Sequence, residues 1–103
     1  MAQVIWTEPA LDQLDEIAEH IALDNPTAAS ALVRKIFKQV DRLEQFPNSG
    51  REPPELPNSI YREVVCGPCR VFYRHEESVV FIVYIMREEM QLRQYLLGVS
   101  NDS

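Results

Sequence analysis

Two cysteines flank a Gly-Pro pair in Cys66-Gly67-Pro68-Cys69, the most conspicuous short motif of the chain. Cysteines at this spacing form a redox centre when they begin a helix, because the helix N-terminus lowers the thiol pKa. The residues that follow, Arg70 to Tyr73, are typical of a strand, and Gly-Pro is ordinary turn material. We therefore expect a hairpin turn at this motif, and a redox role stays the alternative.

A metal site would need about four ligands at suitable spacing. Cys66, Cys69 and His75 are three nominal candidates, whereas His20 lies on a distant predicted helix. No serine, histidine and acid stand in positions that suggest a hydrolase triad, and the carboxylates lie on predicted helix faces and turns. We therefore expect no metal, no cofactor and no catalytic carboxylate.

The arginines of the second half are more informative. Four fall in or at the ends of strand-like runs, where long charged side chains are usually disfavoured: Arg62, Arg70, Arg74 and Arg87. If the Gly67-Pro68 turn has two residues, Val65 faces Arg70 across the hairpin. Arg62 then faces Tyr73, and the two pairs lie on opposite faces of the sheet. A bulge at the proline would change this register, which the sequence leaves open.

Two interpretations of these arginines stay open. Arginines that gather on an open sheet face bind phosphates bidentately or engage an acidic protein surface. Alternatively, they are surface residues that pair with nearby glutamates, for which the sequence offers Glu63, Glu76 and Glu77.

The charge balance favours a protein partner. The chain of 103 residues has 16 acidic and 10 basic residues, which gives a formal net charge of -6. Proteins that hold nucleic acid through its phosphates usually have an excess of lysine and arginine. Here only a modest arginine-bearing surface is expected, in residues 50–75, on an otherwise acidic body.

The first half of the chain predicts a short strand and two helices. Val4-Ile5-Trp6 is β-prone, and apolar residues then recur at three- and four-residue spacing from Leu11 to Ile21. This helix should end near Asn25-Pro26. Asn25 or Thr27 caps a second helix, whose apolar positions run from Ala29 to Phe46. The short connection predicts an antiparallel helical hairpin.

The second half predicts a loop and then a sheet. Four prolines make residues 47–59 an irregular loop. Hairpin-length turns separate three strand-like runs, which predict an antiparallel meander: Ile60 to Cys66, Arg70 to His75 and Val79 to Met86. The last run is apolar on both faces and suits a central strand. Glu88 to Leu97 predict a short helix, and residues 98–103 a flexible tail.

These elements predict an α+β fold with the order β-α-α-β-β-β and a short C-terminal helix. We expect one domain over residues 1–103, with the helical hairpin on one face of the sheet and the other face open. The longest apolar run is far shorter than the roughly 20 residues of a membrane helix. Glu8 and Pro9 interrupt the N-terminus before a signal peptide can form, so we expect a cytoplasmic protein without a membrane partner.

Several segments resemble the RelE/ParE toxin superfamily. They are the run LEQFPNSGR from Leu43 to Arg51, the run Arg62-Glu63-Val64-Val65, and the strand GPCRVFYR from Gly67 to Arg74. The Asn25-Pro26-Thr27-Ala28-Ala29 junction is also similar to ParE-type members. The resemblance covers residues 3–90 and implies a small toxin of a bacterial type II toxin–antitoxin pair.

The resemblance implies one of two activities. RelE-like members are ribosome-dependent mRNA endonucleases, and the residues that stand in their catalytic positions here are Arg62, Arg70, Arg87 and Tyr95. ParE-like members are not nucleases but bind DNA gyrase and stall it with cleaved DNA. For binding of a target, the candidates are the five arginines Arg51, Arg62, Arg70, Arg74 and Arg87.

The ParE-like activity is favoured here. The net charge of -6 suits the ribosomal A site poorly, and no lysine follows Lys38. We therefore expect a gyrase inhibitor, and a RelE-like endonuclease is the alternative.

This chain departs from the family at two positions. The family often has an aromatic residue where this chain has Cys69, and a histidine where this chain has Met86.

The resemblance also implies a cognate antitoxin, ParD-like and DNA-binding. It would wrap a helix-containing segment around the toxin, over an apolar strip on the helical hairpin. Ile17, Leu32 and Phe37 are candidates for this strip, although each also suits the core. DNA binding for autoregulation would come from the antitoxin, so we expect no sequence-specific nucleic-acid binding by this chain.

Overall fold

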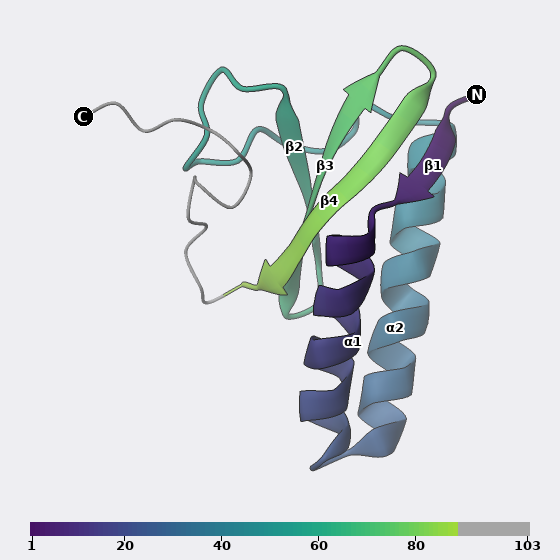
Figure 1. Cartoon of the computed structure of the whole chain (residues 1–103), viewed down its shortest axis with the longest axis vertical. Helices are drawn as coiled ribbons and strands as arrows, with labels where there is room; N and C mark the ends of the chain where they lie inside the picture. The colour runs from purple at the N-terminus through teal and green to yellow at the C-terminus, as the bar shows by residue number, and fades with distance from the viewer. Residues whose placement is uncertain (89–103) are drawn as a thin grey trace.

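The computed structural model describes residues 1–88, which form a four-stranded sheet packed against two helices. The elements are β1 (Gln3–Trp6), α1 (Glu8–Ala22), α2 (Pro26–Asp41), the 3-10 turn η1 (Arg42–Glu44), β2 (Tyr61–Cys66), β3 (Cys69–Glu76) and β4 (Val79–Arg87). Both helices lie on one face of the sheet (Figure 1). The predicted α+β order is therefore confirmed for these elements.

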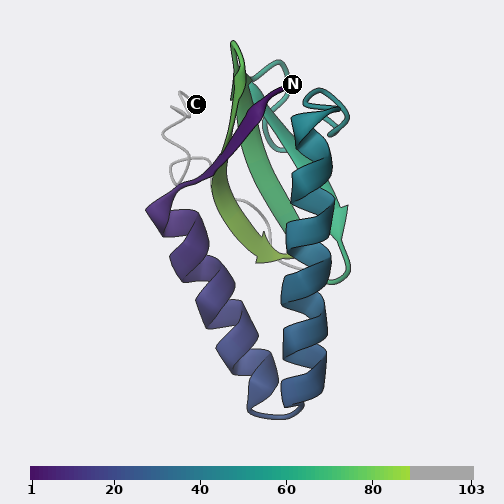
Figure 2. The same ribbon diagram turned by 90° about the vertical axis from the view of Figure 1, so that its right-hand side faces the viewer.

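The helical hairpin forms as predicted, and Asn25 is the residue that caps its second helix. The Asn25 side chain accepts a hydrogen bond from the backbone nitrogen of Ala28 at 3.0 Å, and Pro26 opens α2. The two helices run antiparallel, and their connected end projects beyond the sheet (Figure 2). At the opposite end, the Thr7 hydroxyl donates to the Ile82 carbonyl oxygen at 2.7 Å and ties the start of α1 to β4.

The sheet has the strand order β1-β4-β3-β2. Strands β2, β3 and β4 form the predicted antiparallel meander, while β1 pairs with β4 in parallel. Strand β4 is therefore interior, as its apolar sequence predicted, and β2 is an edge strand. The Gly67-Pro68 turn has two residues, so Val65 faces Arg70 as expected. The register shifts instead between Phe72 and Tyr73, where these residues pair with β4.

The main core lies between the helices and the sheet. Its fully buried members include Ala10 of α1, Ile36 and Val40 of α2, Val71 of β3 and Val80 of β4. This core fixes which face of each strand looks toward the helices, because alternate residues point to opposite faces.

The prediction that the other sheet face stays open is wrong at one end. Leu56, from the proline-rich loop, packs on Phe72 and Met86, and all three side chains are buried. Pro53 of the same loop is also buried. The apolar residues of this face need cover from water, and the loop folds back to provide it.

The predicted helix from Glu88 to Leu97 lies outside the described residues apart from Glu88, and so does the predicted tail. Within residues 1–88, neither helix has the length and the apolar character to span a membrane.

Candidate functional site

The loop of residues 47–51 is fastened to the sheet by Tyr73. The Tyr73 hydroxyl accepts a hydrogen bond from the Gly50 nitrogen at 2.9 Å and donates one to the Pro47 carbonyl oxygen at 2.8 Å. A Cβ atom at position 50 would lie 2.5 Å from the Tyr73 oxygen and 2.9 Å from the Glu63 carbonyl oxygen, so glycine is required. Burial raises the pKa of Tyr73, although the Gly50 hydrogen bond and the charge of Arg62 oppose this.

Two arginines hold the same loop against β2. Arg62 donates from Nη1 to the Gly50 carbonyl oxygen at 2.9 Å. Arg51 and Glu63 exchange two backbone hydrogen bonds, of 2.9 and 2.8 Å, which pair Arg51 with the edge of β2. The Arg51 Nε also donates to Oε2 of Glu63 at 2.7 Å.

A group of charges centred on the buried Arg70 and Glu63 lies next to this loop, and we call its four members, Arg51, Glu55, Glu63 and Arg70, the arginine–glutamate cluster. Nη1 and Nη2 of Arg70 donate to the two carboxylate oxygens of Glu55, both at 2.6 Å. Nε and Nη2 of Arg70 also donate to Oε1 of Glu63, at 2.9 and 2.5 Å. The hydrogen bonds that Arg70 donates to Glu55 raise the pKa of Arg70, although burial opposes them.

The cluster is balanced in charge, and its centre, formed by Arg70 and Glu63, is closed to water. Arg70 is 5% exposed and Glu63 is 1% exposed. The Arg70 guanidinium also lies over the Phe72 ring, 4.9 Å from its centre. Buried charges are tolerated only when they are paired and hydrogen-bonded, so each member depends on the others. A phosphate that approached Arg70 would have to displace a carboxylate.

The remaining candidate arginines lie elsewhere. Arg74 shares the face of Arg70, lies 4.6 Å from the centre of the Phe81 ring and pairs with Glu76 at 3.1 Å. Arg87 is opposite Cys69 in the β3–β4 register, which places it on the helix-facing side of the sheet, as Arg62 is. The structure thus brings Arg51, Arg62 and Arg70 together around one loop, but not Arg74 or Arg87. Tyr95 lies outside the described residues.

A family model for the ParE toxin of the type II toxin-antitoxin system parDE matches residues 4–92. The chain belongs to the ParE toxin family. Similar proteins include "Putative toxin Y4kP" of Sinorhizobium fredii, 36% identical over 96 residues that cover 91% of this chain and 96% of that protein. "Toxin RelE2" of Caulobacter vibrioides is 35% identical over 86 residues, which cover 82% and 93% of the two chains.

Two further comparisons agree with the family. "Toxin ParE3" of Caulobacter vibrioides is 31% identical over 97 residues, which cover 93% of this chain and 96% of that protein. A solved structure described as "Chromosomal ParDE TA system from P. aeruginosa" is similar with a TM-score of 0.73 and 31% identity, and covers 86% of this chain and 98% of that chain. The resemblance to the toxin superfamily is confirmed, and the ParE family implies a cognate antitoxin as partner.

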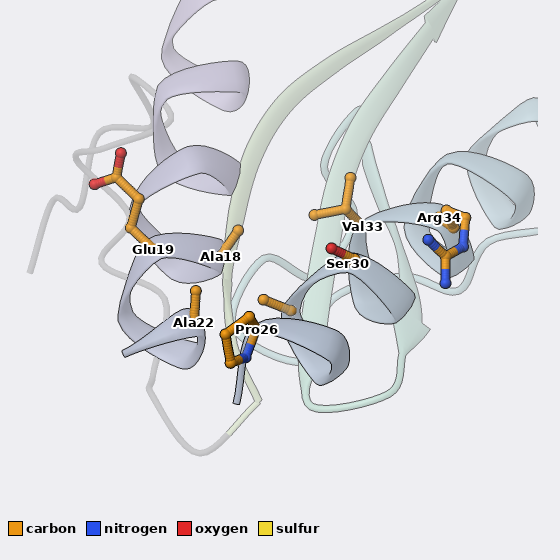
Figure 3. Close-up of a pocket in the computed structure, with 8 residues that line it drawn as sticks. Ala18, Glu19, Ala22, Pro26, Ser30, Val33 and Arg34 are labelled. Atoms are coloured by element: carbon orange, nitrogen blue, oxygen red, sulfur yellow. The ribbon is translucent and has the colours of Figure 1, made fainter. Parts of the chain in front are cut away.

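A groove of about 510 Å³ separates the two helices of this ParE-family toxin near their connection. Ala18 and Ala22 of α1 lie across from Pro26 and Val33 of α2 (Figure 3). The small alanine side chains leave the space between the helices unfilled. We call this surface the helical groove.

The predicted antitoxin contacts are not part of the helical groove. Ile17 and Leu32 are partly buried and pack against the main core. Phe37 is 36% exposed, and its ring packs on Trp6 with the ring centres 4.9 Å apart. Of the three, Phe37 is therefore the most accessible to a partner.

The cysteine motif forms the predicted hairpin turn. Cys66 and Cys69 face each other at the ends of β2 and β3, both are buried, and Cys66 is a free thiol. Burial raises the pKa of Cys66, although the charge of Lys35 opposes this. No helix begins at the motif, and a raised pKa is the opposite of what a reactive thiol needs. Among residues 1–88, no three His, Cys, Asp or Glu side chains are placed to hold a metal ion.

Glu55 is the site residue that the sequence analysis missed. Pairing of the arginines with Glu63, Glu76 and Glu77 was one of the two open interpretations, and the structure shows Arg70 paired with Glu63 and Arg74 with Glu76. Glu55 instead reaches Arg70 from the proline-rich loop. The one available signal was its neighbour Leu56, since an apolar residue among prolines indicates a loop that packs back on the sheet.

Proposed function

We propose that this ParE-family toxin inhibits DNA gyrase by binding it, and that a cognate ParD-like antitoxin neutralises it. The observation that carries the proposal is the state of Arg70, which is buried and hydrogen-bonded to Glu55 and Glu63. Arg70 therefore belongs to an internally satisfied cluster rather than to a surface prepared for a phosphate. This arrangement supports a binding protein over a nuclease.

The positions of the other arginines give the same support. Cleavage of mRNA needs preorganised cations around one phosphate, because negative charge develops there in the transition state. Arg62 and Arg87 lie on the helix-facing side of the sheet, whereas Arg70 lies on the opposite side. The three arginines thus do not share a face on which one phosphate would contact them all.

The net charge also favours a protein target. A formal net charge of -6 disfavours association with RNA, which is itself a polyanion. A protein target needs only a local surface of suitable charge. Arg74 is the candidate that contributes most directly, because it is partly exposed and lies outside the arginine–glutamate cluster.

For the antitoxin, the helical groove is the proposed site. An amphipathic helix places small and apolar side chains into a groove of this kind. Ala18, Ala22 and Val33 provide an apolar floor, and Phe37 extends the apolar surface along α2 toward β1. DNA binding would stay with the antitoxin.

A ribosome-dependent endonuclease is the second candidate function. It is favoured by the 35% identity to "Toxin RelE2". In that case Arg62, Arg70, Arg87 and Tyr95 would be the catalytic group, and Arg70 would have to leave Glu55 and Glu63 to reach its substrate.

Purified gyrase tests the two functions directly. We expect the toxin to inhibit ATP-dependent supercoiling and to increase cleaved DNA, and we expect the co-purified antitoxin to reverse both effects. A translation reaction with purified ribosomes and a defined mRNA should leave the transcript intact. Cleavage of that mRNA, together with normal supercoiling at excess toxin, would overturn the proposal in favour of the endonuclease.

A further inference from the structure

Strand β2 leaves part of its outer edge open. Arg51 occupies this edge at Glu63, where the two residues exchange both of their backbone hydrogen bonds. Alternate residues of a strand direct their backbone groups the same way, so the N–H and C=O of Val65 also point outward. Within residues 1–88, neither group has a hydrogen-bond partner, and Val65 is 38% exposed. An open strand edge of this kind pairs readily with another extended chain.

A groove runs beside this open edge, and we call it the β2 groove. It encloses about 460 Å³ and is lined by Gln39, Arg42, Ser49, Gly50, Arg51, Glu63, Val64 and Val65. Its walls are α2 on one side and the anchored loop of residues 47–51 on the other. The β2 groove shares no residue with the helical groove.

Two cations without an ion pair in residues 1–88, Lys35 and Arg42, lie near the open edge, and the paired Arg51 lies beside them. Lys35 belongs to α2, and its Nζ lies 3.9 Å from where a Cβ of Gly67 would be. Arg42, the first residue of η1, lines the β2 groove. Both side chains are exposed, and among the described residues neither makes a hydrogen bond or ion pair. The Nε of Arg51 donates a hydrogen bond to the Glu63 carboxylate, while 60% of the Arg51 side chain remains exposed to solvent. The carboxylate of Glu63 is already neutralised by Arg70 and Arg51.

We propose that the β2 groove binds an extended acidic segment of a partner polypeptide, which adds to the edge of β2 at Val65. The partner's backbone would pair with the outward N–H and C=O of Val65. Its alternate side chains would point to the two faces, with carboxylates toward Lys35 and Arg42 and apolar side chains beside Val65. Charge complementarity identifies the occupant as acidic, and the strand edge identifies it as a polypeptide rather than a nucleic acid.

This surface goes beyond the proposed function. It lies apart from the helical groove, so a partner on β2 and an antitoxin helix between α1 and α2 would not compete for the same residues. Binding at the β2 groove also requires no effect on gyrase, so either proposal can fail alone.

The test uses a fluorescent peptide of about eight alternating glutamate and valine residues, long enough for one strand. Fluorescence anisotropy at low salt should show saturable binding to the full chain, and the amide resonance of Val65 should shift in a 15N-labelled sample. Arg42→Glu should weaken binding by about tenfold or more, because it reverses a charge in the groove. Arg34→Glu is the matched control, since it makes the same charge change on α2 but lines the helical groove instead of the β2 groove, and it should change binding by less than about twofold.

The variant Val65→Pro provides a second test of the proposal. Proline removes the outward N–H of an edge strand and spares the β2–β3 ladder, so the fold should persist in circular dichroism while peptide binding is lost. Equal weakening by Arg34→Glu and Arg42→Glu, or an unchanged Val65 resonance in the wild-type protein, would overturn the proposal. Stronger binding of a single-stranded deoxythymidine oligonucleotide than of the acidic peptide would assign the surface to nucleic acid instead and would also overturn it.

Discussion

Arg70 and Arg42 represent two regions of this toxin in which the same side chain has opposite surroundings. In the arginine–glutamate cluster, Arg70 is 5% exposed and its guanidinium is shared between Glu55 and Glu63. In the β2 groove, Arg42 is exposed at the end of α2 and makes no ion pair within residues 1–88. The buried arginine stabilises the fold, whereas the exposed one is available to a partner. Arginine content alone therefore does not identify the binding surface of this toxin.

Arg70→Ala should produce the largest loss of stability. It leaves Glu63 buried without its main partner, and breaking a buried pair in this way typically costs about 3–5 kcal/mol. Urea denaturation followed by circular dichroism measures the free energy of unfolding. Arg42→Ala is the matched control and should change it by less than about 0.5 kcal/mol. Similar values for the two variants would mean that the buried and exposed arginines do not differ as described.

Gly50→Ala tests the anchored loop that joins the two regions. A methyl group at this position would meet the Tyr73 oxygen at 2.5 Å and the Glu63 carbonyl oxygen at 2.9 Å, and such overpacking typically costs about 1–3 kcal/mol. The melting temperature should therefore fall. Addition of Tyr73→Phe should not restore the wild-type melting temperature, because the contacts with the ring carbon at 2.7 Å and with Glu63 remain and the hydroxyl's own hydrogen bonds are lost. An unchanged melting temperature in the single variant would contradict this description of the loop.

Tyr73→Phe removes the hydroxyl that bonds to Gly50 and Pro47, and should lower the free energy of unfolding by about 1–2 kcal/mol. Since burial raises the pKa of Tyr73, the folded state keeps the proton that the unfolded state loses first. The contribution of Tyr73 is thus complete below the ordinary tyrosine pKa and declines as the pH rises through its folded pKa. Stability measured across this alkaline range should fall more steeply in the wild type than in Tyr73→Phe, and parallel curves would contradict the pKa shift.

Arg74→Ala should have the smallest effect on stability, about 0.5–1 kcal/mol, because its ion pair with Glu76 is partly exposed and its main contact is the Phe81 ring. Its expected effect is on function, since Arg74 is the accessible arginine of the open sheet face. Supercoiling assays should show weaker gyrase inhibition by this variant than by Arg34→Ala, which changes the same charge on α2. Equal inhibition by both would remove Arg74 from the proposed gyrase surface.

The sequence by itself determined the local structure. Apolar spacing and the Asn25-Pro26 junction predicted the helical hairpin, whereas the β2–β3 register stayed open between a two-residue turn and a bulge until the structure showed the turn. A two-residue turn predicted Arg62 and Arg70 on opposite faces, and pairing of the arginines with Glu63, Glu76 and Glu77 was among the alternatives. These features depend on contacts between residues close together in the chain, where residue type and spacing constrain the geometry directly.

Only the tertiary structure decided how the proline-rich loop packs against the sheet. Its return over the face of β3 buries Leu56, brings Glu55 to Arg70 and closes a surface that strand alternation alone leaves open. It likewise decided that Arg51 occupies the edge of β2 at Glu63 while Val65 stays free. The path of an irregular loop depends on which distant apolar and charged groups it can satisfy, and no periodic pattern along the chain encodes that choice.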